Sequence, residues 1–279
     1  MSEEPSPVVL SGLFIYPVKS LRGIAVESAE VDELGLVGDR RFLVVDDEGR
    51  FLTQRTRPAM ARISTALTEE RLMLTMEGGE TISVARHPDP AAPLRVVSIW
   101  ASEGLQGEDC GDDVAEWLGQ RLEVRCRLVR IGAAFERPLL KPKARPGERF
   151  TFADGYPFLI ASEASLENLN DRLLERGEEP VPMSRFRPNF IVRGCGAFAE
   201  DTWAEFTLGN VVFRGGGNCG RCPVTTTDQL TGERGVEPLR TLAEYRRRTG
   251  DSNLVDFGQN LIHSTKRGSV QVGDEVRVG

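Results

Sequence analysis

The sequence has few histidines and no long apolar segment. Only two of its 279 residues are histidine, His87 and His263, so a catalytic site centred on histidine is poorly supplied. Nowhere do about 18 apolar residues follow one another, and the opening MSEEPSPVVL lacks the basic and apolar regions of a signal peptide. These absences predict a cytoplasmic protein with no membrane partner.

An excess of positive charge is also lacking. The 35 Lys and Arg residues are outnumbered by 42 Asp and Glu residues, which gives a net charge of -7 and a pI of about 5.2. A general nucleic-acid binder needs a wide positive field, so we expect no nucleic-acid partner and only a local site for any anion. Hydrophobic residues make up 40% and charged residues 28%, the ordinary balance of a globular protein.

Cysteine is scarce and irregularly spaced. The odd number of cysteines and their wide spacing do not resemble a secreted disulfide framework, so reduced thiols are expected. The five are Cys110, Cys126, Cys195, Cys219 and Cys222.

Short apolar segments dominate the N-terminal half. Polar and glycine-containing turns separate them, as at residues 47–49 and 77–79. Segments of this length and spacing predict a β-rich subdomain. The predicted strands are LFIYPV, IAVESAEV, RFLVVD, RFLTQR, ISTALT, RLMLTM, TISVAR and RVVSIW.

Helices and further strands follow. Apolar residues at helical spacing predict a helix from Val114 to Leu122. A second helix begins after its cap Ser162 and ends at Gly177, with Leu166, Leu169, Leu173 and Leu174 on one face, and a third begins at Pro238. Residues 136–149 combine prolines with Lys and Arg, which predicts a loop that could border an anionic ligand. The remaining predicted strands are EVRCRLVRI, NFIVRG, AEFTLG and NVVFRG, with a closing hairpin SVQVGDEVRV.

One glycine-rich segment holds two of the five thiols. It reads Gly215-Gly216-Gly217-Asn218-Cys219-Gly220-Arg221-Cys222-Pro223 and lies between the β-rich NVVFR and VTTT. Glycines let a backbone approach a ligand closely, and Arg221 favours a thiolate at Cys222.

Three alternatives remain for this segment. A structural zinc site would use the C-x-x-C pair, although the chain has no second pair and Cys195 and His263 would have to complete the four ligands. Thiol–disulfide exchange has the right spacing but expects the motif at the start of a helix. The third alternative is a glycine-rich hairpin in which the cysteines have no functional role.

Basic and hydroxylic residues at distant strand ends could surround a phosphate-bearing polar ligand, together with the helix N-terminus at Ser162. They are Lys19, Ser20, Arg40, Arg41, Arg55 and Arg187.

Six ordered stretches resemble the MOSC-domain proteins that carry an N-terminal MOSC β-barrel domain, a group that includes the molybdenum cofactor sulfurase C-terminal domain and the amidoxime-reducing molybdoenzymes. The stretches are YPVKS (16–20), GDRRF (38–42), SEASL (162–166), FRPN (186–189), EDTW (200–203) and GRCPVTT (220–226).

This resemblance implies a mainly β fold with short helices (α+β), in which a MOSC-type β-barrel packs with an N-terminal β-barrel subdomain. The expected domains are 8–130 for the N-terminal barrel and 131–279 for the MOSC domain. It also implies a molybdenum–molybdopterin cofactor whose metal takes the Cys222 thiolate as ligand, while the role of Cys219 stays open. The expected binding residues for the pterin and its phosphate are Lys19, Ser20, Arg40, Ser162, Ser165, Arg187, Asn189, Gly220 and Arg221.

The implied activity is that of a molybdenum-dependent oxidoreductase, which removes oxygen from N-hydroxylated substrates such as amidoximes and hydroxylamino bases. No cysteine follows Cys222 to hold an iron–sulfur cluster, so an external electron-transfer protein of ferredoxin, flavodoxin or cytochrome type, with its reductase, is the expected partner. The alternatives are a sulfurase-type sulfur carrier that uses Cys222 and a non-catalytic cofactor carrier.

Overall fold

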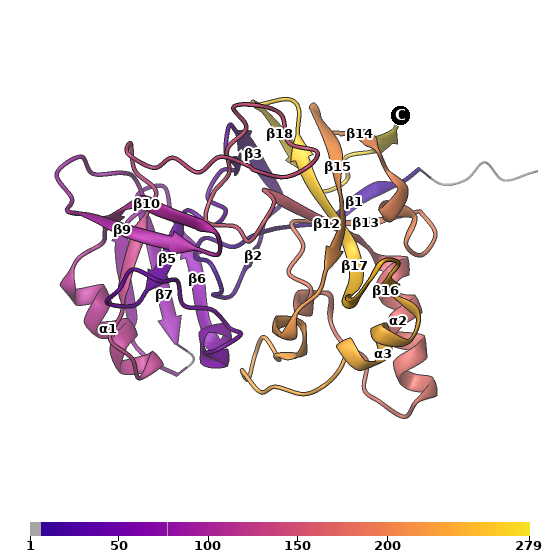
Figure 1. The fold of residues 1–279 in the computed structure, drawn as a ribbon, viewed down its shortest axis with the longest axis horizontal. Helices are drawn as coiled ribbons and strands as arrows, with labels where there is room; N and C mark the ends of the chain where they lie inside the picture. The colour runs from indigo at the N-terminus through magenta and orange to yellow at the C-terminus, as the bar shows by residue number, and fades with distance from the viewer. Residues whose placement is uncertain (1–6, 77) are drawn as a thin grey trace, which may run out of the picture.

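A computed structural model describes residues 7–76 and 78–279. Residues 1–6 of the acidic N-terminus and Glu77 of the turn expected at 77–79 lie outside the described residues. The prediction of a mainly β fold with short helices is confirmed, with the N-terminal half of the chain beside the C-terminal half (Figure 1). In the described part of the chain, no helix combines the length and apolar character needed to cross a membrane.

The largest sheet runs through the C-terminal half and also takes in the first strands of the chain. Its order is β19-β14-β15-β17-β12-β13-β1-β2, with β16 paired to β17. Its strands are β1 (Val9–Ile15), β2 (Ile24–Ala25), β12 (Phe158–Ser162), β13 (Phe190–Arg193), β14 (Glu205–Leu208), β15 (Val211–Gly220), β16 (Arg247–Arg248), β17 (Asp251–His263) and β19 (Val276–Val278).

Smaller sheets make up most of the N-terminal half. One has the order β5-β11-β10-β9, from β5 (Phe42–Val45), β9 (Leu94–Ile99), β10 (Ser102–Asp109) and β11 (Arg127–Arg130). A second is formed by β6 (Ile63–Leu67), β7 (Arg71–Met76) and β8 (Thr81–Ala85), and a third by β3 (Ser28–Asp32), β4 (Gly35–Leu36) and β18 (Gly268–Gln271). Since β1 pairs with β13 and β18 with β3, the two halves share strands across the expected boundary at residue 130, and that boundary stays a prediction.

The helices are short and lie against the sheets. The α-helices are α1 (Asp112–Leu122), α2 (Glu163–Glu175) and α3 (Leu239–Tyr245), and the 3-10 helices are η1 (Pro58–Arg62), η2 (Met183–Arg185), η3 (Ala199–Thr202) and η4 (Pro223–Thr226). In α2, Leu169 and Leu173 are buried but Leu174 is 57% exposed, so the expected apolar face is narrower than predicted.

Aromatic side chains build the core of the large sheet. The Phe158 ring stacks on Phe190 and meets the edge of Phe213, and these three side chains are at most 2% exposed. Such rings remove much apolar area from water, and their edge contacts add about 0.5–1.5 kcal/mol each. The core therefore fixes the ends of β12 and β13, from which cavity residues project.

Three local predictions are wrong. Residues 50–55 are not a strand, since Arg50 and Phe51 form isolated bridges, and the first three residues of VTTT belong to η4. The closing segment is not a hairpin, because β18 pairs with β3 whereas β19 pairs with β14.

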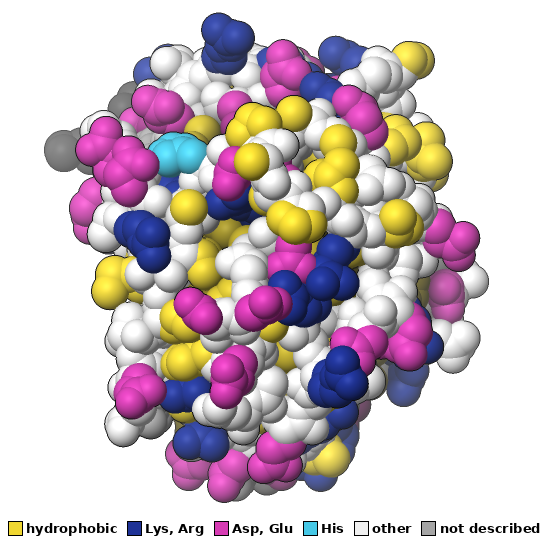
Figure 2. Space-filling view, turned by 90° about the vertical axis from the view of Figure 1, so that its left-hand side faces the viewer, with side chains coloured by type: hydrophobic (Ala, Val, Ile, Leu, Met, Phe, Trp, Pro, Cys, Tyr) yellow, Lys and Arg dark blue, Asp and Glu magenta, His cyan; other side chains and the backbone are white. Residues whose placement is uncertain are grey.

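The face of the molecule in Figure 2 has basic, acidic and apolar side chains intermixed.

Candidate functional site

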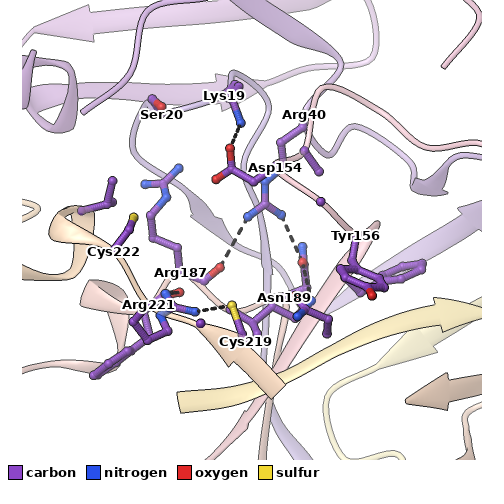
Figure 3. A pocket seen from close by; sticks show the side chains of 18 of the residues that line it. Lys19, Ser20, Arg40, Asp154, Tyr156, Arg187, Asn189, Cys219, Arg221 and Cys222 are labelled. Atoms are coloured by element: carbon purple, nitrogen blue, oxygen red, sulfur yellow. Dashed lines mark hydrogen bonds and ion pairs between the residues drawn. The ribbon is translucent and has the colours of Figure 1, made fainter. Parts of the chain in front are cut away.

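A cavity lies where the N-terminal loops meet the large sheet. It brings together eight of the residues predicted to bind a cofactor or metal (Figure 3). Five basic side chains and a single carboxylate, that of Asp154, line it. The eight predicted residues are Lys19, Ser20, Arg40, Arg187, Asn189, Gly220, Arg221 and Cys222.

Lys19 and Asp154 form an ion pair in the cavity wall. Lys19 is 4% exposed, and burial lowers the pKa of its ammonium although Asp154 opposes that effect. The Asp154 side chain is 62% exposed, and the Lys19 charge with hydrogen bonds from Lys19 and Trp100 Nε1 (2.9 Å) outweighs desolvation and holds its pKa well below the usual range. This end of the cavity is therefore an ionised and internally compensated pair.

Arg40 is compensated in the same way. Its Nη1 donates to both carboxylate oxygens of Asp39, at 2.8 and 2.7 Å, and to Asn189 Oδ1 at 3.1 Å. Asp39 also accepts from the backbone N–H of Tyr16 at 2.8 Å and is 1% exposed. This network fixes the position of Arg40 and Asn189 beside the cavity.

Arg187 has a different environment. Its Nη2 donates to the Leu21 carbonyl at 2.7 Å and its Nη1 to Gln229 Oε1 at 3.1 Å. Its guanidinium lies 4.3 Å from the centre of the Tyr16 ring. Within residues 7–76 and 78–279 it forms no ion pair with a carboxylate, and burial lowers its pKa to about 10. A half-buried cation with only neutral acceptors is favourable for an anionic ligand.

The backbone is strained at this site. Of the six non-glycine residues with positive φ in the described ranges, three line the cavity. These are Ser20 (φ 66°), Arg40 (φ 47°) and Arg187 (φ 56°). Left-handed conformations cost side-chain-bearing residues about 1–3 kcal/mol and gather at functional sites, so the clustering supports a binding role.

Both thiols of the C-x-x-C pair line the cavity. Cys219 is in β15 and Cys222 directly precedes η4, and each is half-buried. Arg221 Nη1 donates to Cys219 Sγ at 3.0 Å and its Nη2 to the Phe186 carbonyl, so the guanidinium contacts the first thiol of the pair. That Arg221 favours a thiolate at Cys222 stays a prediction. All five cysteines are free.

The glycine run is part of a bulged strand rather than a turn. The register of β15 against β17 shifts between Gly215 and Gly217 and again between Asn218 and Gly220. A Cβ at Gly216 would lie 2.6 Å from the Tyr156 ring, and Gly217 has φ 103°. Packing and strand geometry therefore require these glycines, and of the predicted glycines only Gly220 lines the cavity.

Ser162 and Ser165 are not brought into the cavity. Ser162 caps α2 as predicted, with its Oγ accepting from Ser165 N at 3.1 Å. Glu200 Oε1 accepts from Ser162 N at 3.0 Å and from Ser165 Oγ at 2.8 Å. The N-terminus of α2 already holds an anion, the Glu200 carboxylate, and all three side chains are fully buried.

Other lining residues were not predicted. Asp154 and Tyr156 come from the loop before β12, Thr53 from the N-terminal half, and Asn260 from β17. Arg137, in the segment expected to be a solvated loop, is 2% exposed and donates to the carbonyls of Thr151 and Ala153 at 2.7 and 2.6 Å. It thereby supports the backbone that carries Asp154.

The cavity combines a soft donor with an anion-binding wall. Cys222 and Cys219 supply sulfur, while Arg187, Arg221 and Arg55 form no ion pair with a carboxylate in the described part of the chain. In residues 7–76 and 78–279, no group of three or more His, Cys, Asp or Glu side chains could hold a metal ion. The arrangement suits an anionic ligand that lies beside a thiol.

Comparison with known proteins gives matches along both halves. Residues 8–125 match the model of the MOSC N-terminal beta barrel domain and residues 147–277 that of the MOSC domain. Mitochondrial amidoxime-reducing component 1 of Mus musculus is 36% identical over 95% of this chain and 80% of the relative. Mitochondrial amidoxime reducing component 2 of Bos taurus is 34% identical over 96% and 82%. Molybdenum cofactor sulfurase of Danio rerio is 33% identical over 96% of this chain but 33% of the relative.

Proposed function

Because the chain belongs to the MOSC family, with a MOSC N-terminal β-barrel domain ahead of the MOSC domain, we propose that it is a molybdenum-cofactor-dependent reductase of N-hydroxylated compounds. Relatives that carry the name amidoxime-reducing component support this activity. The substrates are amidoximes or hydroxylamino bases, and the electrons come from an external protein of ferredoxin, flavodoxin or cytochrome type with its reductase.

The observation that carries the proposal is the pairing of an accessible thiol with uncompensated cations in one cavity. Cys222 offers the soft thiolate that molybdenum accepts. Arg187 offers a half-buried positive charge whose acceptors are all neutral. A molybdenum–molybdopterin cofactor contains both a metal and a phosphate, so the residues present fit this group.

The chain's own side chains take separate roles in the proposed complex. Cys222 ligates the metal, and Arg187 and Arg221 bind the phosphate and the polar edge of the pterin. Arg40 and Asn189, which hydrogen-bond to each other, and Ser20 orient that edge. The Lys19 ammonium, held by Asp154, keeps a proton at Nζ beside the cavity. When bound, the cofactor supplies two-electron oxygen-atom-transfer chemistry.

The overall reaction balances with an external donor. The N–O bond of the substrate breaks, two electrons and two protons are consumed, and the amine or amidine leaves with water. No histidine lines the cavity among the residues described, so Lys19 and solvent are the proton sources that we propose.

Metal analysis of the purified protein tests the proposal. We expect near-stoichiometric molybdenum in the wild type and in Cys195→Ala, and its loss in Cys222→Ala. Benzamidoxime reduction with reduced viologen dye should follow the molybdenum content. A wild type that carries zinc or no metal, or a fully loaded protein without turnover, would contradict the reductase.

A sulfur-carrier function is the second candidate, because the chain also matches a third of a molybdenum cofactor sulfurase. In that function Cys222 carries a persulfide. Mass spectrometry of the protein separates the two functions: an added sulfur on Cys222 that a thiol reductant removes, with no turnover of amidoxime, favours the carrier.

A further inference from the structure

Two buried glutamines connect the N-terminal half to the loop that follows η4. Gln54 is fully buried and Gln229 is 6% exposed. Gln54 Nε2 donates to Gln229 Oε1 at 3.1 Å, and Gln229 Nε2 donates to Gln54 Oε1 at 3.0 Å. The side chains thus form a reciprocal amide pair across 175 residues of sequence.

The neighbours of this pair fix the orientation of both amides. Gln54 Nε2 also donates to the Ser20 carbonyl at 2.8 Å, and Gln229 Nε2 donates to the Thr227 carbonyl at 3.0 Å. Of the two ends of a glutamine amide, only the nitrogen can donate to a backbone carbonyl. Each Nε2 must therefore face its carbonyl, and each Oε1 must face the other glutamine. The Gln229 oxygen therefore faces the side from which Arg187 Nη1 approaches.

The pair thereby holds two strained cavity residues in place. Ser20 and Arg187, both with positive φ, each contact one glutamine of the pair. Arg187 is anchored by the Gln229 amide and the Leu21 carbonyl, which orient its guanidinium without neutralising its charge. Neither anchor adds negative charge to the cavity.

We propose that Gln229, locked by Gln54, is a positioning residue that orients Arg187 through a neutral acceptor and so leaves its positive charge available to the anionic group of the ligand. A glutamate of the same length at this position would form an ion pair with Arg187, as Asp39 does with Arg40. The cavity would then lose its unpaired cation. The neutral side chain is thus what makes this end of the cavity bind an anion.

The inference rests on the proposed function for the identity of the ligand, but sulfate binding by the cofactor-free chain tests it separately. Sulfate keeps its charge over the neutral range and is the probe. Its affinity is measured by calorimetry together with the thermal midpoint for the wild type, Gln229→Glu and Gln229→Met. Gln271→Glu, an exposed position on β18 outside the cavity, is the matched charge control.

We expect the two Gln229 substitutions to lower stability alike but to differ in sulfate affinity. Gln229→Glu weakens sulfate binding by about ten-fold or more, because its carboxylate neutralises Arg187. It also lowers the thermal midpoint, because an oxygen replaces the amide nitrogen that donates to Gln54 Oε1 and the Thr227 carbonyl. Gln229→Met weakens sulfate less than about three-fold but lowers the midpoint by about 5 °C, because it leaves buried polar groups unpaired. A purely structural role would weaken sulfate binding equally in the two variants. If Gln229→Glu does not fold, Gln229→Asp provides the carboxylate and must also weaken sulfate binding.

The outcomes separate this inference from the proposed function. Three results overturn the inference. In the first, Gln229→Glu binds sulfate as well as the wild type. In the second, Gln229→Met or Gln271→Glu loses as much affinity as Gln229→Glu, and in the third the wild type does not bind sulfate. Molybdenum content of the same proteins, purified with cofactor, is the second readout. If the wild type holds molybdenum and Gln229→Glu holds as much, the inference fails while the proposed function stands. If the wild type holds none but the sulfate pattern appears, the proposed function fails and the inference stands.

Discussion

Two places in this chain have the residue types of an anion site, and only one is open to a ligand. At the start of α2, a capping serine and a helix N-terminus meet the buried Glu200 carboxylate. In the cavity, Arg187 meets only neutral acceptors. The first site holds an anion that the chain itself supplies, whereas the second has none.

The difference shows that donors alone do not define a binding site. Buried charges need partners, and an internal partner removes the need for an external one. Lys19 with Asp154 and Arg40 with Asp39 are intermediate cases, in which cations near the cavity carry their own carboxylates. We therefore expect changes in the cavity to alter ligand affinity and changes at α2 to alter stability.

Arg187→Met tests the open site and has the largest expected effect. The variant removes the unpaired cation, and we expect the retained cofactor to dissociate about 1,000-fold more readily, equivalent to about 4 kcal/mol. Arg121→Met is the control, since Arg121 also stacks on an aromatic ring, that of Trp117 at 4.0 Å, but lies outside the cavity. Molybdenum content after dialysis measures the effect, and equal retention by both variants would remove the distinction between the two sites.

Glu200→Ala tests the filled site. Removing this carboxylate leaves Ser162 N and the Ser165 hydroxyl without their buried acceptor, so we expect a loss of about 3 kcal/mol in the free energy of unfolding. The molybdenum content per folded molecule should stay at the wild-type level. Denaturant unfolding with metal analysis provides both values, and a stable variant that lacks metal would reverse the comparison.

His263 provides a pH test of the rule that the interior avoids uncompensated charge. Burial lowers the pKa of His263 to about 4, and its Nε2 lies 2.8 Å from the Asp32 carbonyl. The unfolded chain binds a proton near the usual pKa of about 6.5, so below that pH it binds more protons than the native state and stability falls. Through His263, the free energy of unfolding should fall by about 2 kcal/mol from pH 7 to pH 5.

His263→Phe should remove this part of the pH dependence, because phenylalanine keeps the edge contact with Phe158 and does not titrate. The control is His87→Phe at an exposed position. Urea unfolding at pH 7 and pH 5 gives the change in stability for each protein. If His263→Phe loses as much stability between pH 7 and pH 5 as the wild type, other titrating groups cause the decrease.

Most strands were predictable because their apolar residues bury one or both faces, as in β12 and β13. β10 was not, since its sequence SEGLQGED is polar. Its Glu108 and Asp109 are buried against arginines of neighbouring strands, with Arg130 Nε 2.8 Å from Glu108 and Arg127 Nη2 2.7 Å from Asp109. A strand stabilised by such cross-strand ion pairs has no hydrophobic pattern to reveal it.

The cavity residues were predictable where chemistry and resemblance agreed, as for Cys222 and Arg187. The sequence could not show which donors already had partners inside the fold. Ser162 and Glu200 are separated by 38 positions, and only the packing of η3 against β12 brings them together. The roles of Gln54 and Gln229 were invisible for the same reason, since a glutamine on a loop is usually solvated.

Ser162→Ala gives the smallest expected effect and the sharpest test of the comparison. The hydroxyl caps α2 by accepting from Ser165 N, so its loss should cost about 1 kcal/mol of stability. If Ser162 bound the cofactor, the same change would also lower the molybdenum content. Ser20→Ala, at a cavity position, is the contrasting variant. We expect metal loss in Ser20→Ala with little from Ser162→Ala, because the carboxylate of Glu200 already occupies the α2 terminus and repels a second anion.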